Sequence, residues 1–165
     1  MIYKRNLAKY DRFGYWPLAV LFKARLLFIL KEVHEEVLVP EAVARELRRK
    51  PEGTIIFSDN PWINATEVKN TELVKALMLV VDEGEAEAIA LALHSGARIL
   101  IDEKRGRNAA RKLGLEIRGT LGLFVEAKKK GTIGSVKECI GELLETGYYL
   151  DAELIEEVLR KADEI

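Results

Sequence analysis

The chain has 165 residues, of which 48% are hydrophobic and 32% are charged. This length suits one domain, which would bury roughly 70% of the surface that its unfolded chain exposes. The composition excludes a disordered chain, a collagen-like repeat and a small scaffold held by disulfides. Cys139 is the single cysteine, so it cannot form an internal disulfide, and we expect a reducing, cytoplasmic setting.

Neither a signal peptide nor a membrane span is predicted. The first twelve residues contain five charged side chains, and Lys23 and Arg25 interrupt the longest apolar stretch, 16–30. Charge is unevenly distributed, because residues 1–31 hold seven Lys/Arg and one Asp, whereas residues 140–165 hold eight acids and two bases. This asymmetry fits either a polyanionic partner or two chain ends that lie against each other. The absence of Gln and the excess of Glu suggest a thermophilic source.

The first half of the chain predicts helices separated by short apolar strands. Pro17 and Pro40 suit the start of a helix, because proline lacks the N–H that the first turn leaves unbonded. Pro51 and Gly53 predict the end of the second helix. In chain order we expect a helix over 17–33, a strand over 36–39, a helix over 41–50, a turn-rich passage over 54–66 with one or two short strands, and a helix over 67–80.

The second half predicts a buried strand between well-delimited helices. Asp82 is a suitable N-cap and Gly96 a suitable end for the helix between them. Residues 97–101 are almost wholly apolar, which is typical of a strand buried on both faces. We expect a helix over 83–95, strands over 97–101 and 115–117, and helices near 104–113, 119–130, 135–146 and 151–163. Short apolar strands that alternate with helices predict an α/β domain with a mainly parallel sheet.

Carboxylates are the main candidates for chemistry. The glycine-rich nucleotide motifs, the G-x-S-x-G elbow and a Cys–His–Asp set are absent, and His34 and His94 lie too far apart for metal-ligand spacing. In a parallel α/β sheet, sites form outside the carboxyl ends of the strands. Asp102 ends the predicted strand over 97–101, and Glu103 follows it. The alternative role for Asp102 is to cap the next helix.

Two more acids are expected near the same end of the sheet. Glu85 lies in the first turn after Asp82, a spacing that also fits a capping box. Glu46 flanks the inward face of its predicted helix, where it would alternatively pair with a base one turn later. Glu46, Glu85 and Asp102 together offer the oxygen ligands that Mg²⁺ or Mn²⁺ prefers. Such a metal activates water and stabilises the departing oxygen in phosphodiester hydrolysis.

A basic segment follows Asp102 directly. Cations this close to an acidic site suit a nucleic-acid substrate, because they attract its phosphates. The alternative is a solvated surface with no ligand. The cations that we expect to bind nucleic acid are Lys104, Arg105, Arg107 and Arg111.

The segment DEGEAEAIALALHSGARILIDEKRGR, which begins at Asp82, resembles the PIN-domain family of metal-dependent ribonucleases. The resemblance extends back to VLVPEAVARELRR and forward through the last predicted helices, so that it covers roughly residues 17–163. It implies a PIN-like (Rossmann-like) three-layer α/β/α fold with a mainly parallel central sheet. We expect this fold to form a single domain over 1–165, with an atypical basic segment at 1–16.

The resemblance also implies a function and a site. Family members bind Mg²⁺ or Mn²⁺ through acids at the carboxyl ends of the strands and cleave single-stranded RNA. Many are toxins paired with an antitoxin protein, and many form dimers, so a homodimer is expected here. By position, the family's acids match Glu46, Glu85 and Asp102, with Glu103 as a neighbouring metal candidate.

The start of the chain departs from the family pattern. The family opens with an apolar strand that ends in Asp or Asn, whereas alignment on Pro17 puts Gly14 at that position and leaves Asp11 as the nearest acid. Two functions therefore stay open: a Mg²⁺- or Mn²⁺-dependent ribonuclease, and a non-catalytic PIN-like module that binds RNA or a protein partner. A DNA-binding regulator is a weaker third alternative, since GTLGLFVEAKKKGTIGS resembles a helix-turn-helix.

Overall fold

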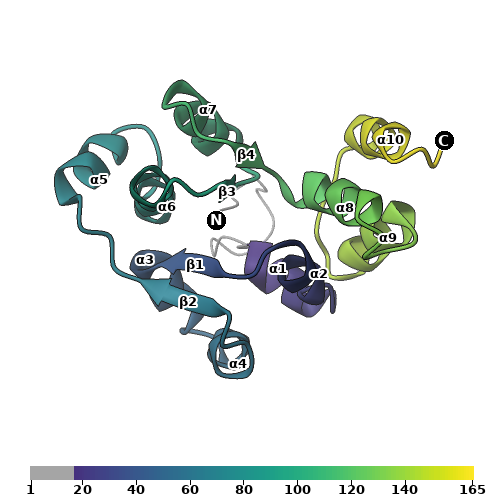
Figure 1. Cartoon of the computed structure of the whole chain (residues 1–165), viewed down its shortest axis with the longest axis horizontal. Helices are drawn as coiled ribbons and strands as arrows, with labels where there is room; N and C mark the ends of the chain where they lie inside the picture. The colour runs from purple at the N-terminus through teal and green to yellow at the C-terminus, as the bar shows by residue number, and fades with distance from the viewer. Residues whose placement is uncertain (1–16) are drawn as a thin grey trace.

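Two pairs of parallel strands lie at the centre of the fold. The computed structural model describes residues 17–165, and Figure 1 shows the course of the chain. The expected α/β class and the parallel pairing are confirmed. Among the described residues the two pairs form separate two-stranded sheets. Strand β1 (Val37–Pro40) pairs with β2 (Ile63–Thr66), and β3 (Ile99–Leu100) pairs with β4 (Ile117–Arg118).

The helix predicted over 17–33 is wrong as a single element, because it is broken near Arg25. Arg25 has a left-handed φ of +59°, and the Leu26 N–H donates to the Leu21 carbonyl at 2.8 Å, which closes the end of the first helix. Apolar side chains lie on nearly every side of this stretch, so one straight helix would leave some of them in water. The break divides it into α1 (Pro17–Lys23) and α2 (Phe28–Val33).

A helix also occupies most of the passage that was predicted to be turn-rich. Pro51 begins α4 (Pro51–Asp59) instead of ending α3 (Glu41–Leu47), because proline fits the first helical position. Gly53 lies so close to α3 that a Cβ there would approach the Leu47 carbonyl oxygen to 1.9 Å. Glycine is therefore needed at this junction for packing, and β2 is the short strand expected in the passage.

The remaining helices lie within a few residues of their predicted positions. The predicted stop at Gly96 is confirmed by its left-handed φ of +66°. In Figure 1, α8, α9 and α10 gather on one side of the strands. Within residues 17–165, no helix has the length and apolar character needed to cross a membrane. The bounds are α5 (Thr71–Leu77), α6 (Glu83–Ser95), α7 (Lys104–Lys112), α8 (Thr120–Lys129), α9 (Val136–Glu145) and α10 (Ala152–Lys161).

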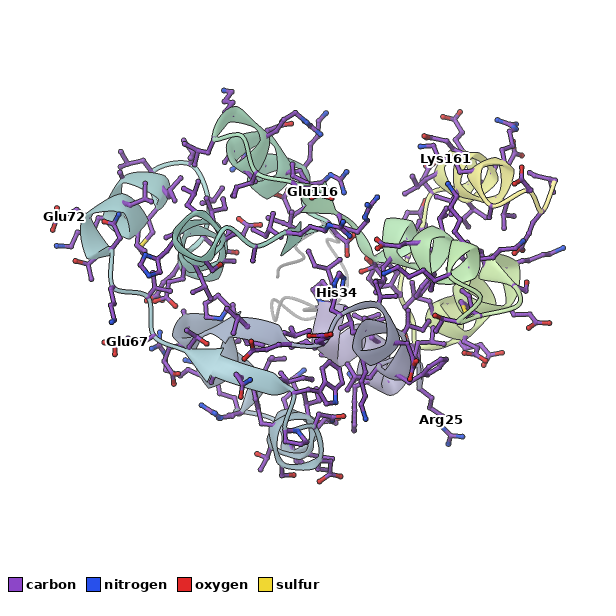
Figure 2. All side chains as sticks on the ribbon, viewed as in Figure 1. Arg25, His34, Glu67, Glu72, Glu116 and Lys161 are labelled. Atoms are coloured by element: carbon purple, nitrogen blue, oxygen red, sulfur yellow. The ribbon has the colours of Figure 1, made fainter. Side chains whose placement is uncertain are left out.

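One hydrophobic core connects the strand pairs with the helices around them. Phe124 of α8 and Ile29 of α2 are fully buried, and these two helices pack against each other. Figure 2 shows Arg25, Glu72 and Lys161 pointing outward, whereas His34 points toward the middle of the molecule. The core therefore joins the C-terminal helices to the strand-bearing part of the fold.

Glu164 holds the end of the chain against α8 and α9. Its Oε1 accepts hydrogen bonds from the Lys128 Nζ at 2.9 Å and the Val136 N–H at 2.5 Å. Its Oε2 accepts from the Lys137 N–H at 2.8 Å and the Ser135 hydroxyl at 3.2 Å. Burial would raise the pKa of Glu164, but these bonds outweigh it and lower the pKa to about 2. The ionised carboxylate therefore stabilises this corner.

Replacing Glu164 with Gln should lower the free energy of unfolding by about 1–2 kcal/mol at pH 7. This is less than the full pKa shift implies, because solvent screens a carboxylate near the surface. Folding lowers the pKa of Glu164 from 4.5, so its contribution is present above that pH and is lost as the pH falls toward 2. The difference between the variant and the parent protein should therefore shrink in acid, and urea unfolding at several pH values measures it.

Glu157→Gln is the matched control for this prediction. Glu157 lies on the exposed face of α10 and pairs with Lys161 one turn away. Because an exposed ion pair contributes little to stability, the control should leave the unfolding midpoint nearly unchanged. A Glu164→Gln difference that stays constant from neutral pH to acid would contradict the assigned role of the Glu164 charge.

Candidate active site

Asp102 lies at the carboxyl end of β3, as predicted, and is bound to the start of α8. Its Oδ1 accepts a hydrogen bond from the Thr120 N–H at 2.8 Å, and its Oδ2 accepts one from the Thr120 hydroxyl at 2.6 Å. Burial raises the pKa of Asp102, while the two bonds from Thr120 and the charge of Arg107 oppose that rise. Sequence reasoning missed Thr120, and the only available signal was a hydroxyl residue in the first turn of the helix predicted near 119–130.

Arg107 turns inward toward the end of β3. Its Nη1 donates to the Ile101 carbonyl at 3.3 Å. A Cβ at Gly119 would lie 2.8 Å from both this Nη1 and the Asp102 Oδ1, so the guanidinium and the carboxylate border the same glycine. Only glycine leaves room for both groups. Arg107, which we expected to bind phosphate, is half-buried beside Asp102.

Glu103 caps α7, the role considered above for Asp102. Its Oε2 accepts hydrogen bonds from the Arg105 N–H at 2.7 Å and the Gly106 N–H at 3.2 Å. A carboxylate at a helix N-terminus satisfies unbonded N–H groups and is stabilised by the helix dipole. Capping by Glu103 leaves the Asp102 carboxylate to contact α8.

Glu85 combines the predicted capping box with burial. The Asp82 Oδ1 accepts from the Glu85 N–H at 2.9 Å, and the Glu85 Oε2 accepts from the Asp82 N–H at 3.1 Å. The residue is only 3% exposed, unlike most helix caps. A Cβ at Gly106 would lie 3.2 Å from the Glu85 Oε1, so this carboxylate faces the first turn of α7. Glu85 and Asp102 therefore both border the start of α7.

Glu46 lies at the end of α3, beside the start of α6. Two contacts fix the direction in which these helices cross. The Ala42 N–H donates to the Glu87 Oε2 at 2.8 Å, and Arg45 pairs with Glu83 at 3.4 Å. Later residues of α3 therefore lie beside earlier residues of α6. Glu46, near the end of α3, is thus at the same end of the helix pair as Glu85, in the first turn of α6.

The acids at this end have the right chemistry for a hard divalent cation. Mg²⁺ is usually held by one or two carboxylates, with water and substrate phosphate completing its shell. Asp102 and Glu85 match this donor set. No three acids, histidines or cysteines of residues 17–165 gather into a complete metal cage. Asp11, the other acid considered, lies outside the described residues.

Helix α7 presents three of the four predicted cations to solvent. Lys104, Arg105 and Arg111 are exposed, and the Arg111 Nη1 donates to the Asn108 Oδ1 at 3.1 Å. Because α7 begins two residues after Asp102, this charge lies beside the acidic end of β3. The structure thus brings together a buried carboxylate, a partly buried carboxylate and an exposed basic helix.

Comparison with known proteins identifies the family of the chain. No curated protein and no solved structure is significantly similar to the chain. Residues 16–164 match a family described as DUF3368, a PIN domain. The PIN fold is that of nucleases, which generally depend on a metal ion and act on RNA or DNA. Because this match covers nearly the whole chain, the protein belongs to the PIN-domain family.

Proposed function

We propose that this protein is a Mg²⁺- or Mn²⁺-dependent nuclease that cleaves single-stranded RNA. The observation that carries the proposal is the position of Asp102, an acid at the carboxyl end of β3 that directly precedes an exposed basic helix. Membership of a family of generally metal-dependent nucleases supports it. A cleaving site of this kind needs acids for the metal and cations for the phosphate backbone, and both are present.

Asp102 and Glu85 are the residues that would hold the metal, with Glu46 at the same end of α3 and α6. A bound divalent ion supplies activated water and stabilises the departing oxygen. Thr120 keeps the Asp102 carboxylate in one orientation through two hydrogen bonds. Arg107 is a positioning residue, because its guanidinium donates to the Ile101 carbonyl at the end of β3 and lies half-buried beside Asp102.

Lys104, Arg105 and Arg111 are the residues that would bind the RNA backbone. Bare carboxylates repel a phosphodiester, so exposed cations on the neighbouring helix are needed to hold the strand. A flexible single strand can place one phosphate against the partly buried Asp102, whereas a rigid duplex meets the surface of α7 first. This difference favours single-stranded substrates.

Asp102→Asn should reduce cleavage of single-stranded RNA on the order of 100-fold or more, because the amide lacks the charge that binds a cation. The melting temperature should stay within about 4 °C of the parent, since Asn has the same size and can still bond to Thr120. Labelled single-stranded RNA, single-stranded DNA and duplex RNA are incubated with Mg²⁺, Mn²⁺ or EDTA, and the products are separated by electrophoresis.

Asp151→Asn provides the matched control for the cleavage assay. Asp151 caps α10 through the Glu153 N–H and lies outside the candidate site. This variant should cleave at the parent rate. Undiminished cleavage by Asp102→Asn would refute the assigned role of Asp102, and cleavage of DNA alone would refute the proposed substrate.

A second candidate function is a PIN module that binds RNA or a protein without cleaving RNA. Two observations favour it: both Asp102 oxygens accept bonds from Thr120, and the acids of residues 17–165 form no complete metal cage. Such a module would bind RNA in the presence of EDTA. Its affinity would fall steeply with salt, because the attraction comes from phosphate contacts.

Both functions predict that α7 contacts the RNA backbone. Replacing Lys104 and Arg105 with Gln together should reduce the slope of log affinity against log salt by about 1.4, since each phosphate contact on a single strand contributes about 0.7. Binding is measured by fluorescence anisotropy in the Asp102→Asn background, where RNA stays intact. The control pair, Arg160→Gln with Lys161→Gln on α10, should leave the slope unchanged, and an unchanged slope in the α7 variant would exclude these contacts.

A further inference from the structure

The acids of the candidate site lie between two groups of cations. One group is on α7, whose first turn faces Glu85 of α6. The other is at the end of α3, where Arg45 pairs with Glu83 in the first turn of α6. Figure 1 shows α6 and α3 lying between α7 and α4. A strand that crosses the acids from α7 therefore reaches the corner where α3 meets α4.

At this corner an exposed arginine lies on an aromatic ring. Arg48 directly follows α3, and its Cζ lies over the Phe57 ring of α4, 4.6 Å from the ring centre. Phe57 is about one turn after Gly53, on the side of α4 that touches the end of α3. The ring covers one side of the guanidinium, while 44% of the Arg48 side chain is exposed. The other flat side of the guanidinium therefore faces solvent.

The edge of this guanidinium already has an anionic partner. The Arg48 Nη1 donates to the Glu41 Oε1 at 3.4 Å, so part of its charge is neutralised and a further anion gains less there. Its flat side is not used by that bond. Guanidinium planes stack on nucleobases, and every base has a flat π-face to offer. The ligand group that suits Arg48 is therefore an unpaired base, and not a phosphate.

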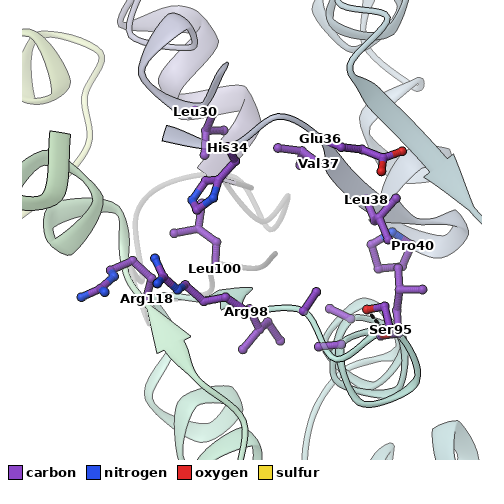
Figure 3. A pocket seen from close by; sticks show the side chains of 15 residues that line it. Leu30, His34, Glu36, Val37, Leu38, Pro40, Ser95, Arg98, Leu100 and Arg118 are labelled. Carbon is purple, nitrogen blue, oxygen red and sulfur yellow. Dashed lines mark hydrogen bonds between the residues drawn. The ribbon is translucent and has the colours of Figure 1, made fainter. Parts of the chain in front are cut away.

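The arginines of another part of the molecule are held differently. Arg98 and Arg118 line the pocket that Figure 3 shows. Arg98 contacts Glu116 at 2.7 Å and Glu126 at 2.8 Å, and Arg118 contacts Glu126 at 3.3 Å. These close carboxylates occupy the guanidinium groups and tie β4 to α8. Arg48 has instead one long ion pair and a more exposed side chain.

Exposed cations beside Arg48 can hold the backbone of the same strand. Arg49 and Lys50 follow it directly, and both are exposed. Proteins that bind single strands combine stacking surfaces for the bases with cations for the phosphates. The corner between α3 and α4 offers both within a few residues.

We propose that Arg48, supported by Phe57, stacks on a base of single-stranded RNA, on the side of the acids opposite α7. Arg49 and Lys50 bind the neighbouring phosphates. This inference rests on the proposed function, because it assigns a second contact to the same substrate. A base inside a duplex is already paired and stacked on both faces, so this contact also selects single strands.

The test compares two labelled strands of about 12 nucleotides bound to the full chain. One is oligoadenosine, and the other has the same sugar-phosphate backbone without bases. Binding is measured by fluorescence anisotropy in the Asp102→Asn background, where RNA stays intact. Arg48→Lys keeps the charge but removes the flat group, so it should weaken oligoadenosine binding by about tenfold and weaken abasic-strand binding much less. Undiminished oligoadenosine binding, equal losses for both strands, or no binding of oligoadenosine before the substitution would overturn the proposal.

Arg160→Lys is the matched control for the same chemical change. Arg160 is exposed and pairs with Glu156 at 3.0 Å on α10, away from the corner between α3 and α4. This variant should bind both strands as tightly as the protein without it. A loss of oligoadenosine binding as large as that of Arg48→Lys would count against the corner as the place of the contact.

A second variant removes the support of Arg48. Phe57→Leu leaves the guanidinium without a ring beneath it, so oligoadenosine binding should fall by about threefold or more. Phe28→Leu, on an exposed side chain of α2, is its control and should have no effect. Melting temperatures report whether each variant folds, and Arg48→Lys decides the question should Phe57→Leu unfold. RNA cleavage is scored separately with Asp102 intact, so either proposal can fail alone.

Discussion

The pair of hydrogen bonds between Asp102 and Thr120 is the contact on which the arrangement of the candidate site depends. It joins the end of β3 to the first residue of α8, across 18 positions of sequence. Helix α8 packs against α2, α9 and α10. The same two bonds therefore orient a carboxylate and set where the C-terminal helices begin. A site built this way is rigid on one side, because the carboxylate cannot rotate without losing a bond to a buried threonine.

The parts of the fold that sequence predicts well are those that local chemistry determines. The Asp82 cap and the left-handed Gly96 delimit α6 through groups only a few residues apart. The break at Arg25 depends instead on how many apolar side chains the surrounding core can cover. The start of α4 at Pro51 has a similar origin, because proline suits both the end of one helix and the start of the next. Sequence leaves this ambiguous, and packing decides it.

The candidate site shows the same division. The position of Asp102 at the end of a strand and the basic character of α7 follow from the order of residues. The order of residues does not decide which of two adjacent acids caps α7, because Asp102 and Glu103 both suit that position. In the structure the cap is Glu103. The threonine partner of Asp102 could not be found from local pattern. Glu85 shows that one residue can take part in a helix cap and also border the candidate site. Its carboxylate accepts the Asp82 N–H at the start of α6 and also faces the first turn of α7.

The junction at Gly53 has a mechanical consequence for the site. The backbone of α4 touches the last carbonyl of α3 so closely that no side-chain atom separates them. The two helices therefore form a stiff corner. Glu46 lies one residue before this corner and β2 follows α4, so the corner fixes where the end of α3 lies relative to the pair formed by β1 and β2. The hydrogen atom of Gly53, in place of a methyl group, thus lets α4 approach α3 closely enough to hold Glu46 in a fixed position relative to this strand pair.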